Sequence, residues 1–211
     1  MVQSEEGRRT SPSPSQLLRK TLIAVGVAAV FAIYIVGRSR WPEGYAVHET
    51  IEWSGIAMIA VCIAGRTWCS LYIGGRKDRD LVRVGPYSLC RNPLYVFSIV
   101  GAMGVGAQHG CFTAAVSAGL AAALVFFPVV LSEERSLRAA FGREYSDYAQ
   151  KVPRFVMDFG NWQDLPTVQI RPAKVLMTFA DGCAFLIAIP AAQLAEHLQN
   201  SGMLPVLVRL P

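Results

Sequence analysis

The chain has 211 residues, of which 53% are hydrophobic and 17% are charged, and its net charge is +5. About a quarter of the residues of a soluble domain are charged, so this composition excludes an ordinary soluble globular protein. Nucleic-acid binding would need a soluble basic face with interleaved aromatic residues, which the sequence does not offer, so no nucleic-acid partner is expected.

Long apolar runs divide the chain. Five of them approach or reach the ~17–25 residues that cross a bilayer as a helix, namely 21–37, 51–65, 94–107, 112–131 and 175–194. The first run is longer than the apolar core of a signal peptide and lacks a small-residue cleavage site, so we expect it to be retained. Residues 1–20 are rich in Ser, Pro and charge and are expected to be disordered. The sequence therefore predicts an all-α, polytopic membrane helical bundle with about five transmembrane helices.

Basic residues are distributed unevenly among the connections. Segments 1–20, 66–93 and 132–174 together hold 17 of the 20 Lys and Arg residues. Because basic connections stay in the cytoplasm, the N-terminus and these three segments are predicted to be cytoplasmic. A multi-pass protein of a bacterial inner membrane is expected, with anionic lipid headgroups attracting its net positive charge.

Two neighbouring runs, 94–107 and 112–131, are separated by only a few residues and predict a tight helical hairpin. Small residues recur four apart on both sides, at Ala102, Gly106 and Gly110 and at Ala114, Ala118 and Ala122. Such spacing lets helices approach closely in lipid. The Gly-rich stretch 101–106 lies inside an apolar run with no preceding strand, so it is interpreted as helix packing and not as a nucleotide-binding loop.

A polar, basic, turn-rich segment, 81–95, precedes the hairpin. Gly-Pro at 85–86 predicts a turn, and Asn-Pro at 92–93 predicts a helix start, with Asn as the N-cap and Pro at the first helical position. The positive end of that helix, with Arg91 beside it, is suited to hold a carboxylate or phosphate. An ordinary juxtamembrane turn is the alternative.

After the hairpin, Glu133 and Glu134 open a stretch whose apolar residues recur at helical spacing: Leu137, Phe141, Tyr145 and Tyr148. This pattern predicts an amphipathic helix on the cytoplasmic surface, which Gly142 is able to break. The two adjacent carboxylates at the mouth of the bundle are candidates for a functional site. The alternative is that they merely favour the dipole at the start of a surface helix.

Cysteine and histidine do not form a recognisable pattern. The five cysteines include no C-x-x-C pair, and His48, His109 and His197 are scattered, so neither a metal site nor a disulfide framework is expected. Cys90 lies beside Arg91, which would favour a thiolate, although an inert buried residue is the preferred interpretation. Asp181 lies well inside the last apolar run, and we expect it to make a polar contact inside the bundle.

The motifs Gly85-Pro-Tyr, Arg91-Asn-Pro-x-Tyr, Glu133-Glu134 and Phe141-Gly-x-Glu-Tyr-x-x-Tyr occur in this order across residues 60–157. In order and spacing they resemble the isoprenylcysteine carboxyl methyltransferase family, whose relatives include phospholipid N-methyltransferases and some membrane reductases. The resemblance covers about residues 60–157 and implies a methyltransferase core at 66–157. Together with the apolar runs it divides the chain into a disordered N-terminus (1–20), two transmembrane helices (21–65), this core (66–157), and a linker with the last helix and tail (158–211), of which the first span and the last helix with its tail lie outside the resemblance.

The resemblance also implies S-adenosylmethionine as cofactor. The cofactor-binding residues that it implies are Gly85, Tyr87, Arg91, Asn92, Pro93, Tyr95, Glu133 and Glu134. Arg91 and the following helix start would meet the methionine carboxylate. Glu133 or Glu134 would accept hydrogen bonds from ribose hydroxyls or the amino group, and Tyr87 or Tyr95 would lie against the sulfonium.

Two departures from the family pattern concern the substrate side. The family's histidine is Asn92 here, which argues against a histidine acid–base step. Lys151 stands where the prenylcysteine enzymes have an arginine, and the region around Arg66 stands where they have a glutamate. Lys151 or Arg154 is therefore the candidate for orienting an acceptor carboxylate.

Methyl transfer to a carboxylate needs alignment and a dry site, whereas an amine would first have to lose a proton. This favours a carboxylate or thiolate acceptor over an amino-lipid. The resemblance implies O-methylation of an isoprenylcysteine-type carboxylate, and the acceptor is expected to be a lipophilic small molecule or lipid. The alternatives are N-methylation of a phospholipid amine, a nicotinamide-dependent membrane reductase, and a non-catalytic membrane scaffold.

Overall fold

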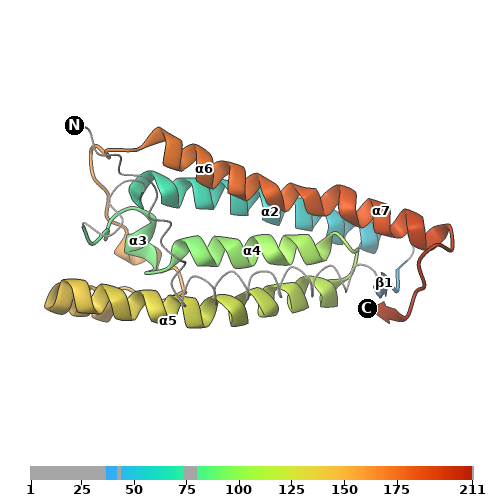
Figure 1. Cartoon of the computed structure of the whole chain (residues 1–211), viewed down its shortest axis with the longest axis horizontal. Helices are drawn as coiled ribbons and strands as arrows, with labels where there is room; N and C mark the ends of the chain where they lie inside the picture. The colour runs from blue at the N-terminus through green and yellow to red at the C-terminus, as the bar shows by residue number, and fades with distance from the viewer. Residues whose placement is uncertain (1–36, 42–43, 74–79, 211) are drawn as a thin grey trace, which may run out of the picture.

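The structure is a computed structural model that describes residues 37–41, 44–73 and 80–210. Within these ranges the chain is mainly helical, and its long helices run side by side along one axis (Figure 1). The segment predicted to be disordered, 1–20, and almost all of the first predicted span, 21–37, lie outside the described residues.

Three helices form the centre of the bundle: α2 (Ala46–Ile73), α4 (Pro93–Ala107) and α5 (Phe112–Lys151). Helix α4 packs against α2 on one side and against α5 on the other. The central position of α4 follows from its composition, since its residues are almost all apolar or small and every face can be covered.

The C-terminal part of the chain forms a long helical segment beside α2, which we call the rod (residues 172–200). It consists of α6 (Pro172–Cys183), the 3-10 turn η2 (Ala184–Ile187) and α7 (Ala188–Asn200). The 3-10 turn directly precedes the turn that holds Pro190, whose ring removes one N–H donor from the α-helical ladder. Asp181 is exposed on α6, so the contact predicted for it inside the bundle does not form among the described residues.

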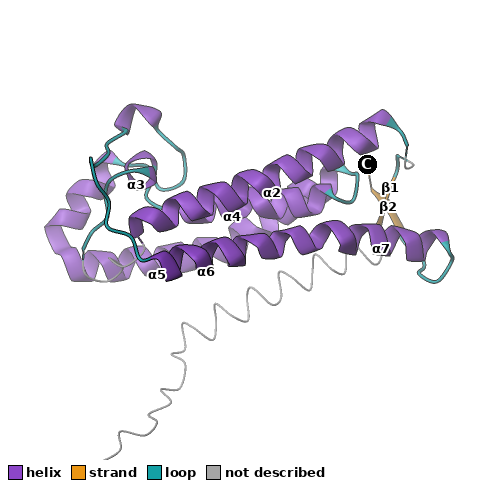
Figure 2. Ribbon diagram, turned by 90° about the horizontal axis from the view of Figure 1, so that it is seen from above, coloured by secondary structure: helices purple, strands orange, loops and turns teal. Residues whose placement is uncertain are grey.

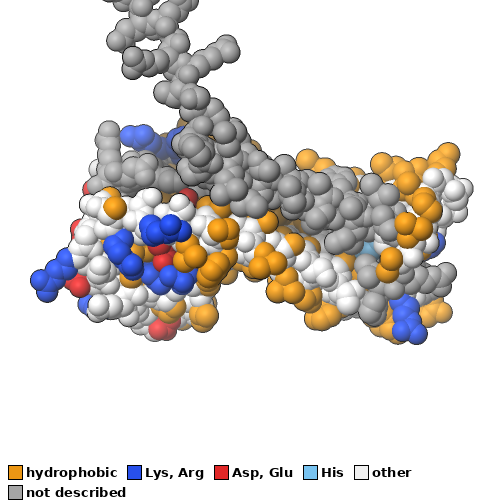
Figure 3. Space-filling view, turned by 60° about the horizontal axis from the view of Figure 1, so that its bottom comes forward, with side chains coloured by type: hydrophobic (Ala, Val, Ile, Leu, Met, Phe, Trp, Pro, Cys, Tyr) orange, Lys and Arg blue, Asp and Glu red, His pale blue; other side chains and the backbone are white. Residues whose placement is uncertain are grey.

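Among the described residues, α2, α5 and the rod 172–200 are each long and apolar enough to cross a membrane. Helix α4 has 15 residues and is shorter than these three. The prediction of an all-helical membrane bundle is confirmed, and the total of five spans stays a prediction. Figure 3 shows hydrophobic side chains around the middle of the molecule, while Lys, Arg, Asp and Glu gather over one end.

The predicted hairpin of α4 and α5 is confirmed, and a small residue explains its tightness. A Cβ atom on Gly106 would lie only 2.3 Å from the carbonyl oxygen of Ala114. Any larger side chain would push the two backbones apart, so the small-residue pattern in the sequence does reflect close helix packing.

Helix α5 is interrupted once, at Gly142, where φ is 52° and ψ is −117°. Beyond this break, Tyr145 and Tyr148 are buried against Val152 and Leu81. The amphipathic pattern predicted for this stretch is confirmed in its buried face, while its place at the cytoplasmic surface stays a prediction.

The two ends of the bundle are built differently. At one end lie the short helix α3 (Pro86–Leu89) and the 3-10 turn η1 (Phe159–Asn161). At the other end, strand β1 (Gly37–Ser39) pairs in parallel with β2 (Val208–Leu210), a contact between distant parts of the chain (Figure 2). The sequence analysis did not predict these strands, because neither is long enough to show an alternating pattern.

Candidate functional site

The turn before α3 brings the basic segment against the end of α2. Gly85 has φ 62° and ψ −137°, and a Cβ atom there would lie 2.3 Å from the ring of Tyr72. Both the backbone angle and the contact require glycine. The N–H of Gly85 donates to the carbonyl of Gln163 at 2.7 Å, so the segment after α5 folds back over this end. The turn predicted at 85–86 is confirmed.

Helix α4 begins as predicted, with Pro93 at its first position, but Asn92 does not cap it with its side chain. The Asn92 amide nitrogen instead donates to Glu134 Oε1 at 3.1 Å and to the carbonyl of Arg154 at 3.3 Å. A hydrogen bond to a buried carboxylate is charge-assisted and stronger than a neutral capping bond. The prediction of side-chain capping by Asn92 is therefore wrong for this physical reason.

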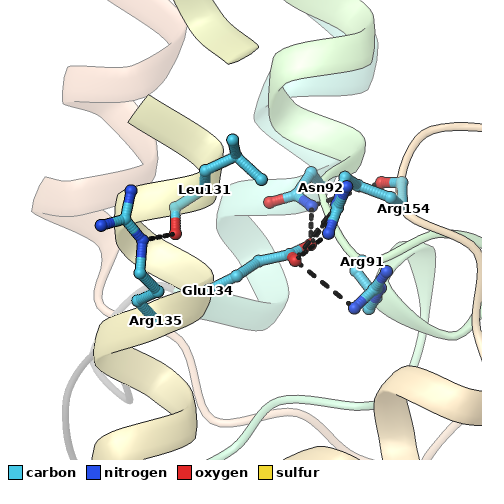
Figure 4. A network of polar contacts seen from close by, with 6 residues as sticks. All are labelled: Arg91, Asn92, Leu131, Glu134, Arg135 and Arg154. Carbon is cyan, nitrogen blue, oxygen red and sulfur yellow. Dashed lines mark hydrogen bonds and ion pairs between the residues drawn. The ribbon is translucent and has the colours of Figure 1, made fainter. Parts of the chain in front are cut away.

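Glu134 is the centre of the polar cluster at this end (Figure 4). Its side chain is 7% exposed, and both of its oxygens accept hydrogen bonds from Arg154, at 2.9–3.1 Å. Arg91 reaches the same carboxylate at 3.5 Å, and Asn92 completes the set. The cluster thus joins α5, the start of α4 and the segment after α5.

The charges in this cluster do not cancel. Two guanidinium groups face one carboxylate, which leaves a surplus of one positive charge in a partly buried place. The hydrogen bond to Glu134 raises the pKa of Arg154, so this guanidinium remains charged. Nε of Arg91 and the hydroxyl of Tyr145 are buried and make no well-aligned hydrogen bond among the described residues, although the two side chains interact with each other. The arrangement is suited to an anionic ligand with acceptor oxygens.

The two tyrosines of the motif differ in their surroundings. Tyr87 is 7% exposed, and its backbone carbonyl accepts a 2.7 Å hydrogen bond from the Tyr148 hydroxyl. Burial raises the pKa of Tyr87 well above its ordinary value, and neighbouring groups, Glu133 among them, raise it further. Tyr95 packs its ring against Phe126 of α5, with 5.2 Å between the ring centroids.

The two remaining polar candidates lie outside the Glu134 cluster. Glu133 is half-buried and points elsewhere than Glu134, since consecutive helical residues face directions about 100° apart. Lys151 is exposed at the end of α5. Of the two residues proposed to orient an acceptor, the structure therefore brings Arg154 into the cluster and leaves Lys151 at its edge.

Cys90 is fully buried, and this burial raises the pKa of its thiol to about 11. The thiolate that Arg91 would favour is therefore not formed at neutral pH. The structure does not favour a reactive Cys90, because burial raises the pKa of its thiol by more than a hydrogen bond from the Asn92 backbone lowers it.

Arg66 is a site residue that the sequence analysis noted only by its place in the family pattern. Its guanidinium donates a short hydrogen bond to the Ser98 hydroxyl across the α2–α4 contact. Its Nε is buried without a hydrogen-bond partner among the described residues. The available signal was a single Arg inside an apolar run, a position that is costly unless it has a function.

Comparisons with known proteins place the chain in a family. The profile of the phospholipid methyltransferase family matches residues 53–144. The nickel-cobalt-cadmium resistance protein NccN of Alcaligenes xylosoxydans is 37% identical over 89% of this chain and 87% of its own length. The cobalt-zinc-cadmium resistance protein CzcN of Cupriavidus metallidurans is 33% identical over 88% of this chain and 85% of its own.

A more distant relative carries an enzyme name. Protein-S-isoprenylcysteine O-methyltransferase B of Arabidopsis thaliana is 26% identical over 54% of this chain and 58% of its own length. No solved structure gives a significant match. The resemblance inferred from the motifs at residues 85–148 is thus confirmed: the chain belongs to the family of the phospholipid and isoprenylcysteine methyltransferases, and NccN and CzcN are its relatives over most of its length.

Proposed function

We propose that this protein is an integral membrane methyltransferase that uses S-adenosylmethionine and acts on a carboxylate of a lipophilic acceptor. The observation that carries the proposal is the buried cluster of Arg91, Arg154 and Glu134, with one surplus positive charge and a buried donor left over. It lies in the part of the chain that contains the family motifs.

The residues of this end fit the cofactor, which supplies an activated methyl group on a sulfonium. Nε of Arg91 would donate to the methionine carboxylate, near the positive end of α4. Glu134 already accepts from three side chains, and a carboxylate has about four acceptor positions. Glu133 is therefore the better acceptor for the cofactor's amino or ribose groups, and Glu134 acts as a positioning residue for the two arginines.

The acceptor is proposed to be an anion because the cations near the site outnumber their partners. Arg66 is partly buried, and among the described residues no carboxylate lies within ion-pair distance of it. Together with Arg154 it offers a carboxylate a cationic path from the bilayer to the cofactor end. Burial keeps Tyr87 a neutral phenol, so this tyrosine would not take a proton from an amine acceptor.

Two further features complete the proposal. The distribution of Lys and Arg supports the proposal that this end of the bundle lies in the cytoplasm. Because the relatives NccN and CzcN are named for metal resistance, we propose that the methylation product serves a metal-resistance system. The acceptor would then be a membrane component whose charge is removed by esterification.

Binding of S-adenosylhomocysteine to detergent-purified protein tests the proposal by calorimetry. The wild type is expected to bind it and to ignore a nicotinamide dinucleotide. Arg91→Ala is expected to weaken binding at least tenfold. Arg135→Ala is the matched control, because Arg135 donates to Leu131 of its own helix and points away from the cluster (Figure 4). Binding of the dinucleotide alone would favour a reductase. No binding by folded protein would favour a scaffold.

A further inference from the structure

A second polar cluster lies at the opposite end of the bundle. His48 and Glu52 stand one turn apart at the start of α2, and Glu196 lies on α7. His48 Nε2 is 3.3 Å from a Glu52 oxygen and 3.7 Å from a Glu196 oxygen. The three potential ligand atoms all lie within 4.8 Å of one another. Helix α2 thus connects this cluster with the end that carries the family motifs (Figure 1).

The ring of His48 is held in a fixed orientation. It is 3% exposed, and it packs so closely on Gly110 that a Cβ atom there would lie 2.1 Å from the ring. Its Nδ1 lies 3.0 Å from the carbonyl oxygen of Trp41. A carbonyl only accepts, so Nδ1 carries the hydrogen and the lone pair of a neutral imidazole is on Nε2.

This lone pair faces two groups that also only accept. Nε2 makes no hydrogen bond among the described residues, and the oxygens of Glu52 and Glu196 are directed at it. Three acceptor atoms that converge on one partly buried point would be stabilised by a cation bound between them.

We propose that His48, Glu52 and Glu196 bind a divalent transition-metal ion, with Zn²⁺ as the best match. Metal–ligand bonds of ~2.0–2.2 Å in a tetrahedral site put ligand atoms ~3.4 Å apart, close to the 3.3 and 3.7 Å between His48 Nε2 and the two carboxylates. One imidazole and two carboxylates are a ligand set for Zn²⁺, Co²⁺ or Ni²⁺. The Nδ1 contact with the Trp41 carbonyl is the outer-shell bond that orients a ligating histidine.

This site does not depend on the proposed methyl transfer. Its ligands come from helices distant in sequence, so a bound ion would join the start of α2 to α7. Three protein ligands leave one tetrahedral position for water or another donor, as in zinc sites that exchange or react. The sequence analysis expected no metal because it weighed cysteine spacing. The pair His48-x-x-x-Glu52 on one helix face was the signal that it passed over.

Zinc binding by the full-length protein, purified in detergent and stripped with a chelator, tests the inference. Competition with a chromophoric chelator is expected to show one tight equivalent of Zn²⁺, and Co²⁺ is expected to give the intense visible absorption of a four-coordinate site. Glu52→Gln and Glu196→Gln keep side-chain size and are each expected to weaken binding at least tenfold. Ca²⁺ is expected not to compete, since an imidazole is a poor ligand for it.

The matched controls are Glu49→Gln and His197→Ala, two exposed residues next to the ligands in sequence. Both are expected to bind Zn²⁺ like the wild type. Equal Zn²⁺ affinity in Glu196→Gln, Glu52→Gln and the wild type would overturn the proposal. So would the absence of a tight equivalent in protein that melts cooperatively, which would leave a proton as the cation on His48.

Discussion

Replacing Glu134 with Gln removes the single carboxylate from a cluster that contains two guanidinium groups. Removing one partner from a buried ion pair costs about 3–5 kcal/mol, because the remaining charge is left uncompensated. Arg91 is 11% exposed, but Arg154 is 36% exposed and can regain water. We therefore expect Glu134→Gln to lower the free energy of unfolding by about 3 kcal/mol. For a chain of this size that corresponds to a fall of ~6–12 °C in the melting temperature.

The control is Glu144→Gln on the same helix. Glu144 pairs with Arg83 at 2.8 Å, a distance as short as any in the Glu134 cluster, but the two side chains are 49% and 47% exposed. An exposed pair contributes ~0–1 kcal/mol, so the expected shift is below ~4 °C. Melting of detergent-solubilised protein at one scan rate gives both values. Equal shifts in the two variants would refute the reasoning that burial decides the cost.

Two further predictions concern the segment between α2 and α4. Gly85→Ala strains the backbone and also places a Cβ against the Tyr72 ring, so we expect it to lower both the melting temperature and the affinity for S-adenosylhomocysteine. Gly142→Ala, at φ 52° in open space, strains the backbone alone, so we expect it to cost only ~1–3 kcal/mol of stability. Cys90, with its pKa raised to about 11 by burial, is expected to resist alkylation at pH 8 in the folded protein and to react in denaturant, as mass spectrometry of the modified peptide will show. Similar losses of stability in Gly85→Ala and Gly142→Ala would contradict the prediction for the glycines. Modification of Cys90 in folded protein at pH 8 would contradict the prediction for the cysteine.

Local chemistry explains what the sequence predicted well. The start of α4 at Pro93 was predictable because a missing N–H costs nothing there. The break at Gly142 was predictable because positive φ favours glycine. The hairpin was predictable because only a few residues separate the apolar runs 94–107 and 112–131, and small residues such as Gly106 indicated its close packing. Each of these features depends on residues that are close in the chain.

The partners of the polar side chains were not predictable in the same way. Which of Glu133 and Glu134 meets the arginines depends on how α5 is rotated against α4, and a rotation of ~100° exchanges the two. The side chain of Asn92 does not cap α4 because its amide hydrogen-bonds to the buried carboxylate of Glu134. Likewise, Glu196 meets His48 only because the rod packs along α2, so no local pattern could link them.

The replacement of the family's histidine by Asn92 bears on the chemistry itself. A histidine in contact with Glu134 would titrate near neutral pH and would change the charge that Arg91 and Arg154 experience. The amide supplies the same donor to Glu134 without titrating, so the surplus positive charge of the cluster is constant across the physiological range. A constant positive charge stabilises an anionic ligand at every such pH, but it cannot remove a proton. Under the proposed function, the cluster would hold and align groups that are already anionic. A carboxylate acceptor is then nucleophilic without losing a proton, whereas an ammonium group would first have to lose one.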